Sequence, residues 1–132
     1  MKLSTKSRYG TRFLIELAEH YNEGPIQTGF VAERQGISVK YLEQIIVPLR
    51  KADLVKSIRG RNGGHMLARP PEEINMGEVL EALEEGIDIT GCIDKPDSCK
   101  RSVTCKSRDL WEIVAAAISN RLNSLKLSEM IK

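Results

Sequence analysis

The sequence predicts a mainly α-helical fold with one small β-wing and a long helix near the C-terminus. Apolar residues recur at helical spacing in five segments, which predicts five amphipathic helices. Two short runs of alternating apolar and polar residues flank a glycine-rich connection, which predicts a β-hairpin. The chain has 132 residues, of which 41% are hydrophobic, so it is long enough for one small domain with an extension.

Three of the predicted helices come before the hairpin. An apolar residue at every fourth position predicts a helix over Ser7 to Asn22. A short helix over about Gly29 to Gln35 follows, with Thr28 as its N-cap. Gly36 then ends the short helix, and Ser38 caps a third helix whose buried stripe leaves polar residues facing outward.

The hairpin is predicted from Leu54–Ile58 and His65–Ala68, which flank Arg59-Gly60-Arg61-Asn62-Gly63-Gly64. Helix, short helix, turn, helix and hairpin is the order of a winged helix-turn-helix domain, which we place at residues 1–70. Residues 71–132 are predicted to form a sensor loop and dimerisation helix region.

This second region contains two helices and one segment without a period. Asn75 can cap a helix that ends at Gly86, and no periodicity is found from Ile87 to about Lys106. The longest helix is predicted over about Arg108 to Leu125, with Ser107 as its cap.

The balance of charged residues changes sign close to the same boundary near residue 70. Residues up to Arg69 include 12 Lys and Arg against 6 Asp and Glu, whereas the remainder has 8 against 12. A basic front half joined to an acidic rear half indicates a module that binds a polyanion. An unevenly charged solvated surface would give the same counts, so charge alone leaves the choice open.

The predicted fold assigns a DNA-contacting role to polar residues of the front half. Outward side chains at the start of the third helix would reach base edges or phosphates in the major groove, while the hairpin tip is thin and cationic enough for a narrow minor groove. Cations and amides at the start of the first helix favour phosphate. The predicted DNA-binding residues are Lys2, Ser4, Lys6, Arg8, Thr28, Ser38, Lys40, Tyr41, Glu43, Gln44, Arg59, Arg61 and Asn62.

The longest helix carries an apolar stripe formed by Leu110, Ile113, Val114, Ala117 and Ile118. This stripe is too apolar for an isolated surface helix, and packing against a second copy would bury it. The alternative is that the stripe packs across the core of its own domain. We expect a homodimer, because a two-fold DNA reader needs a two-fold protein.

Three cysteines, Cys92, Cys99 and Cys105, fall in the segment without periodicity. A loop that carries three thiols within fourteen residues can wrap around a metal centre. No Cys-x-x-Cys pair is present, which disfavours a structural zinc ribbon. The spacing leaves open three solvated thiols, one disulfide with a free thiol, or a redox switch without metal.

Several segments resemble the Rrf2 family of bacterial winged-helix regulators, which includes the iron–sulfur cluster assembly regulator, the nitric-oxide-sensing repressor and the cysteine-metabolism repressor. The resemblance is carried by Lys2–Tyr9, Ile37–Gln44, Leu54–Gly60 with Gly63-Gly64, and Met76–Leu80. It implies a homodimer bridged by the late helix, with each protomer reading half of a roughly palindromic operator. It also implies that the residue at the position of Glu43 helps to choose the operator class.

The resemblance further implies a 2Fe–2S or 4Fe–4S cluster on the three loop cysteines. Sensing members usually have five residues in each gap, whereas this chain has six in the first. The family's histidine and aspartate ligands correspond to Arg108 and Arg8, and a guanidinium cannot ligate iron. Asp109 is then the nearest carboxylate, and a water or a small thiol could also complete the site. Weaker candidates are Asp88, Asp94, Asp97 and Glu43.

The sequence therefore predicts a dimeric, sequence-specific transcriptional regulator that binds double-stranded DNA and is gated by an iron–sulfur cluster. The alternative is a cluster-free regulator of the same fold that senses cysteine or redox status through thiols or a protein partner. A metal carrier would need a denser cysteine run, and no catalytic motif predicts an enzyme. With no export signal or membrane-length apolar stretch visible, we expect a cytoplasmic protein without a membrane partner.

Overall fold

The computed structural model describes residues 3–84, 89–93 and 95–131, and confirms the mainly helical fold with a small β-wing. The front half contains helices α1 (Thr5–Glu19), α2 (Thr28–Gln35) and α3 (Val39–Lys51). Strands β1 (Val55–Ile58) and β2 (Gly64–Leu67) follow as an antiparallel pair in which Val55 faces Leu67. The order is that of a winged helix-turn-helix, as the sequence predicts.

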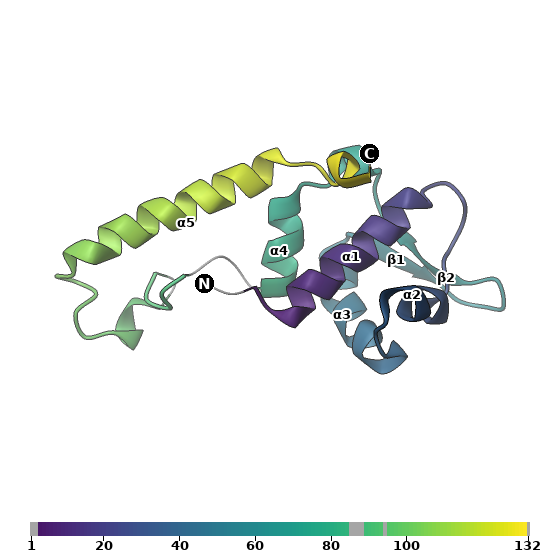
Figure 1. Ribbon diagram of the computed structural model, residues 1–132, viewed down its shortest axis with the longest axis horizontal. Coiled ribbons are helices and arrows are strands. Elements are labelled where there is room, and N and C mark those ends of the chain that lie inside the picture. The colour runs from purple at the N-terminus through teal and green to yellow at the C-terminus, as the bar shows by residue number, and fades with distance from the viewer. Residues whose placement is uncertain (1–2, 85–88, 94, 132) are drawn as a thin grey trace.

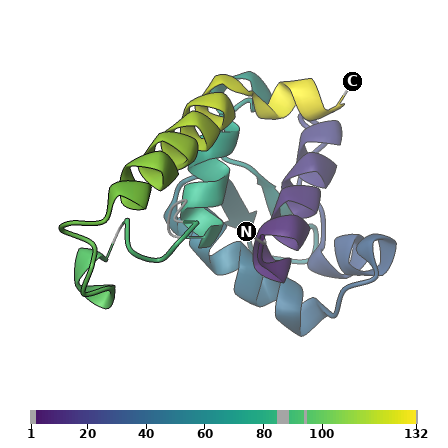
Figure 2. The same ribbon diagram turned by 60° about the vertical axis from the view of Figure 1, so that its left-hand side comes forward.

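The rear half adds α4 (Met76–Glu84) and the long α5 (Lys106–Ser124). Short 3-10 turns, named η1 (Pro71–Glu73), η2 (Pro96–Ser98) and η3 (Leu127–Ile131), separate or follow these helices. Figures 1 and 2 show α5 meeting α4 and η3 at its C-terminal end and extending away from α1, α2 and α3, so that the cysteine segment lies at the far end of this arm. No helix within the described ranges is both long and apolar enough to span a membrane.

One hydrophobic core joins the front half to α4 and η3. Phe13 of α1, Ile45 of α3, Val79 of α4 and Leu127 of η3 are all fully buried in it. Gly10 allows the close approach of α1 to α3 and α4, because a Cβ there would lie 2.6 Å from Leu83 Cδ1. The core therefore contains residues from both sides of the predicted boundary at residue 70.

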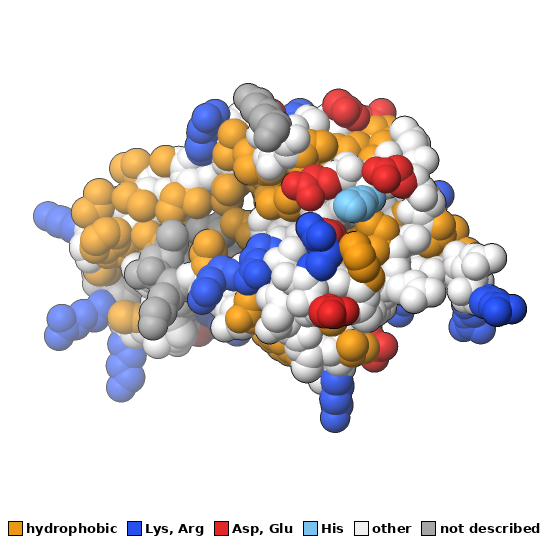
Figure 3. Space-filling view, turned by 45° about the vertical axis from the view of Figure 1, so that its right-hand side comes forward, with side chains coloured by type: hydrophobic (Ala, Val, Ile, Leu, Met, Phe, Trp, Pro, Cys, Tyr) orange, Lys and Arg blue, Asp and Glu red, His pale blue; other side chains and the backbone are white. Residues whose placement is uncertain are grey.

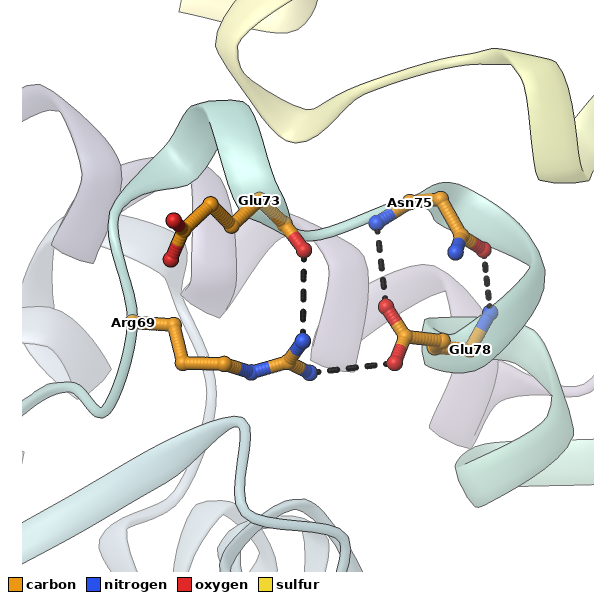
Figure 4. Close-up of polar contacts among 4 residues, drawn as sticks. All are labelled: Arg69, Glu73, Asn75 and Glu78. Carbon is orange, nitrogen blue, oxygen red and sulfur yellow. Dashed lines mark hydrogen bonds and ion pairs between the residues drawn. The ribbon is translucent and has the colours of Figure 1, made fainter.

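Local capping explains where several helices begin. The Ser38 hydroxyl accepts from the Tyr41 amide at 3.1 Å, which confirms the predicted cap of α3. Asn75 and Glu78 form a reciprocal capping box at the start of α4, as predicted for Asn75. Figure 4 shows that Arg69 joins this box by donating to the carboxylate of Glu78 and to the carbonyl of Glu73.

Two predicted caps are wrong. Thr28 is the first residue of α2 and not its N-cap, which is Gln27, because the Thr28 hydroxyl bonds the His65 ring instead. Ser107 lies inside α5, since this helix begins at Lys106 with Cys105 in the N-cap position. Each of the two hydroxyls is hydrogen-bonded to a side chain and not to a helix amide.

Candidate nucleic-acid interface

The start of α3 presents polar side chains to solvent. Lys40, Glu43 and Gln44 are exposed, as the sequence predicts, and Ser38 is exposed at the N-cap. Tyr41 is half-buried because its ring packs edge-on against Tyr9 of α1, with centroids 6.1 Å apart. The face that remains free on this helix combines a cation, a carboxylate and an amide, which suits base edges and phosphates in a major groove.

The hairpin between β1 and β2 forms a narrow cationic tip. Arg59, Arg61 and Asn62 are all exposed there. Gly60 has a positive φ of 111°, and a Cβ on Gly63 would collide with the backbone of Ile58. Glycine therefore keeps the tip thin at the point where its charge is greatest, which fits entry into a narrow groove.

The residues predicted to contact phosphate at the start of α1 differ in their exposure and in their hydrogen bonds. Arg8 is exposed and Lys6 is half-buried, whereas Lys2 lies outside the described residues. Ser4 caps α1, and its amide donates to Glu84 Oε1 at 2.8 Å. The same carboxylate oxygen accepts from the buried Ser7 hydroxyl at 2.6 Å, so α4 supplies the acidic group that the first turn of α1 lacks.

A polar cluster behind the recognition face was not found by sequence reasoning. The His65 ring contacts Thr28 through Nε2 at 2.7 Å and Ser57 through Nδ1 at 2.8 Å. Arg50, from the last turn of α3, donates to the Ser57 hydroxyl at 3.3 Å. Residues from α2, α3, β1 and β2 thus meet at one imidazole, and no local pattern marks partners 37 positions apart.

The two histidines behave differently. Both ring nitrogens of His65 are hydrogen-bonded. His20 instead packs against the Phe30 ring, and its Nδ1 atom has no hydrogen-bond partner in the described part of the chain.

The three cysteines are free thiols on one exposed segment. Cys99 is exposed, while Cys92 and Cys105 are half-buried and lie 3.0 Å from the hydroxyls of Thr90 and Ser107. The Ser107 hydroxyl, followed by the backbone at Arg108, lowers the pKa of the Cys105 thiol. Within the described ranges no three potential ligands are grouped closely enough to hold a metal ion. The donor set fits iron–sulfur ligation chemically, but the segment has to close to bring the thiols together.

Comparison with known proteins decides the family. A sequence model of the Rrf2 family, described as an iron-dependent transcriptional regulator, matches residues 3–132. This chain belongs to the Rrf2 family. It is 42% identical over 132 residues to the protein rrf2 of Nitratidesulfovibrio vulgaris, which covers 100% of this chain and 88% of that protein.

Two solved structures of the Rrf2 type share the fold closely. CymR, the global cysteine regulator of B. subtilis, superposes with a TM-score of 0.81 and 36% identity, covering 99% of this chain and 96% of CymR. IscR of T. potens gives a TM-score of 0.77 with 38% identity, covering 99% of this chain and 86% of IscR. The chain is therefore a transcriptional regulator of the Rrf2, IscR and CymR type and not an enzyme, as the sequence predicts.

The Rrf2 chain leaves most of the apolar stripe of α5 uncovered. Ile113 is 67% exposed and Leu110 is 51% exposed, although Ala115 on the opposite side is buried against the rest of the protomer. In the space-filling view, apolar side chains gather over the surface that α5 forms (Figure 3). A large apolar patch on a folded chain marks a contact surface.

Arg8 is exposed, whereas Arg108 has polar partners. Arg108 pairs with Glu112 at 2.9 Å and donates to the carbonyl of Ile93 at 3.4 Å. Asp109 and Asp97 are exposed, as is Glu43, whereas Asp88 and Asp94 lie outside the described residues. Asp109 lies one helical turn beyond Cys105, so it is the carboxylate nearest in sequence to a thiol with a lowered pKa.

Proposed function

We propose that this Rrf2 protein is a homodimeric, cytoplasmic repressor that reads a two-fold DNA operator and is gated by an iron–sulfur cluster on Cys92, Cys99 and Cys105. Regulation of transcription rests on family membership. The cluster is supported by one observation above all: three free thiols lie on one segment of a chain that matches a family described as iron-dependent.

The DNA-binding surface of the proposal has two parts. Lys40, Glu43 and Gln44 of α3 would enter a major groove, with Ser38 and Tyr41 at its edge. The wing tip with Arg59, Arg61 and Asn62 would reach the neighbouring minor groove. Lys2, Ser4, Lys6, Arg8 and Thr28 would lie near the phosphates.

A double charge reversal tests this surface. Lys40→Glu with Arg59→Glu should abolish binding to a duplex selected by the wild-type dimer from a random-sequence pool, while circular dichroism stays unchanged. Lys51→Glu with Lys126→Glu is the matched control, because it changes net charge equally at two exposed positions outside the proposed DNA-binding residues and the α5 stripe. If the first variant binds as tightly as the control, the DNA-binding surface lies elsewhere.

The cysteine segment would act through the elements that it connects. A bound cluster would supply thiolate–iron bonds that tie three positions of the segment together. The segment joins α4, whose last residue Glu84 holds the start of α1, to α5, whose apolar stripe would meet the second protomer. A coupling of about 1–3 kcal/mol between the segment and the DNA surface would change operator occupancy severalfold or more.

A cluster-free thiol sensor is the second candidate. It is favoured by the lowered pKa of the Cys105 thiol and by the likeness to CymR. The Cys92→Ser, Cys99→Ser, Cys105→Ser triple variant separates the two candidates when iron, sulfide and visible absorbance are measured after anaerobic purification. Loss of iron and absorbance together with altered binding to the selected duplex supports the cluster. Altered binding by an iron-free wild type on thiol oxidation supports the thiol sensor.

A further inference from the structure

His65 lies where the wing meets the helix-turn-helix. Its backbone pairs with Ile26, in the loop before α2, through two hydrogen bonds of 2.9 and 2.8 Å. Its ring packs edge-on against Phe13 of α1 at 6.1 Å between centroids. The two ring nitrogens contact Thr28 and Ser57, so this one side chain touches α1, α2 and β1 from its place on β2.

The groups around the ring determine which atom donates and which accepts in each hydrogen bond. A guanidinium can only donate, so the Ser57 hydroxyl accepts from Arg50 and has its own hydrogen left to give. That hydrogen can go to His65 Nδ1 when this nitrogen carries no proton. In the neutral ring the proton then lies on Nε2, which donates to Thr28.

The surroundings of the ring favour this neutral state. Burial of the ring, followed by the charge of Arg50, lowers the pKa of His65, and the charge of Glu43 opposes this effect. Glu43, Val47, Arg50 and His65 also line one hollow between the recognition helix and the wing. The ordered ring therefore borders the surface on which a major-groove reader would place DNA.

We propose that His65 is a positioning residue for DNA binding, because its ring holds the wing to α2 through Thr28 and to the recognition helix α3 through Ser57, which accepts from Arg50. This inference rests on the proposed DNA-binding surface. His65 itself acts through other residues: it orders β1 and β2, and the hairpin carries Arg59 to the position where it would meet the minor groove.

A double-mutant cycle between His65 and Arg59 tests the proposal. Arg59→Ala should weaken binding to the selected duplex by about tenfold in the wild-type background. His65→Phe keeps the ring packing but removes both polar contacts, and should weaken binding by about fivefold. In the His65→Phe background, Arg59→Ala should cost less than half as much free energy as in the wild type, because a loosely held wing contributes less.

Lys40→Ala provides the comparison, since Lys40 lies on α3, which is held in the core by Leu42, Ile45, Ile46 and Leu49. Its cost should be the same in both backgrounds. His20→Phe is the matched control for the ring exchange, because His20 has no such hydroxyl contacts among the described residues. Thermal unfolding of every variant is measured to separate lost positioning from lost folding.

Conservative variants and a spectroscopic measurement complete the experiment. His65→Asn can replace the Nδ1 contact to Ser57 and His65→Gln the Nε2 contact to Thr28, so at least one should recover part of the affinity and of the coupling to Arg59. Nitrogen-15 NMR of the wild type should show the tautomer protonated at Nε2 at neutral pH. Equal costs of Arg59→Ala in both backgrounds would overturn the proposal, whereas no cost in the wild type would instead refute the proposed wing contact.

Discussion

The front half and the α5 arm, which consists of α5 with the cysteine segment at its far end, differ in the side chains at their surfaces. In the front half, polar side chains are tied to one another: Arg34 pairs with the buried Glu16, and His65 holds two hydroxyls from different elements. On the arm, large apolar side chains lie in the open, with Val103 at 93% exposure and Ile113 at 67%. Among the described residues of the front half no large apolar side chain is more than 46% exposed, so the arm is the part of the molecule whose apolar surface best suits a contact with a partner.

The largest effect is expected from a charged substitution in the apolar stripe of α5. Ile113→Asp places a charge in the centre of the uncovered stripe, so we expect the homodimer to separate and affinity for a two-site duplex to fall by about 100-fold. Light scattering and DNA titration measure the two consequences. Met130→Asp is the matched control, because it also adds an acid at an exposed apolar residue but lies on η3. A dimeric Ile113→Asp protein would show that the stripe is not the dimer contact.

The next effect tests how tightly the front half is packed. Gly10→Ala would place a methyl group 2.6 Å from Leu83 Cδ1 and 3.2 Å from Ile45 Cγ2, so we expect the free energy of unfolding to fall by about 1–3 kcal/mol. Gly29→Ala is the control, because no atom lies within 4 Å of its Cβ and alanine favours the helix. Urea unfolding measures both variants. Equal stability of Gly10→Ala and wild type would mean that α1, α3 and α4 can separate slightly without cost.

The sequence predicted those features that arise from neighbouring residues. The caps Ser38 and Asn75 bond amides three positions ahead, so the local pattern was sufficient. The predicted caps Thr28 and Ser107 are wrong because their hydroxyls have competing partners, one of which is 37 positions away. A tertiary contact decides the case of Thr28, and a single sequence does not show it, whereas the partner of Ser107 is Cys105, only two positions away.

The features of the candidate site also divide into those that local sequence patterns predict and those that they do not. The exposed residues of α3 and the wing tip followed from helix periodicity and turn chemistry. The cluster around His65 was not predicted from such local patterns, because its residues come from four different elements. The cysteine spacing indicated a metal centre, yet the three thiols are not grouped in the described chain, because spacing along a segment without periodicity does not set the distances between its side chains.

The smallest effect concerns a polar contact between α1 of the front half and α4, the helix that precedes the cysteine segment. The Ser7 hydroxyl, as the main cause, lowers the pKa of Glu84 by bonding its carboxylate. A folded-state pKa below the unfolded value means that the contact stabilises the protein above the unfolded pKa and loses this effect as pH falls through the folded pKa. Glu84→Gln should therefore lower stability by about 1 kcal/mol at neutral pH and by less at an acidic pH, as the pH falls through the folded-state pKa.

Glu81→Gln is the control for that comparison, because Glu81 is exposed on the preceding turn of α4. Urea unfolding at the two pH values gives the difference between the variants. A Glu84→Gln protein as stable as the control at neutral pH would show that the carboxylate charge does not hold α1 to α4. If the predicted loss is found, the contact that precedes the cysteine segment also stabilises the first turn of the DNA-binding half.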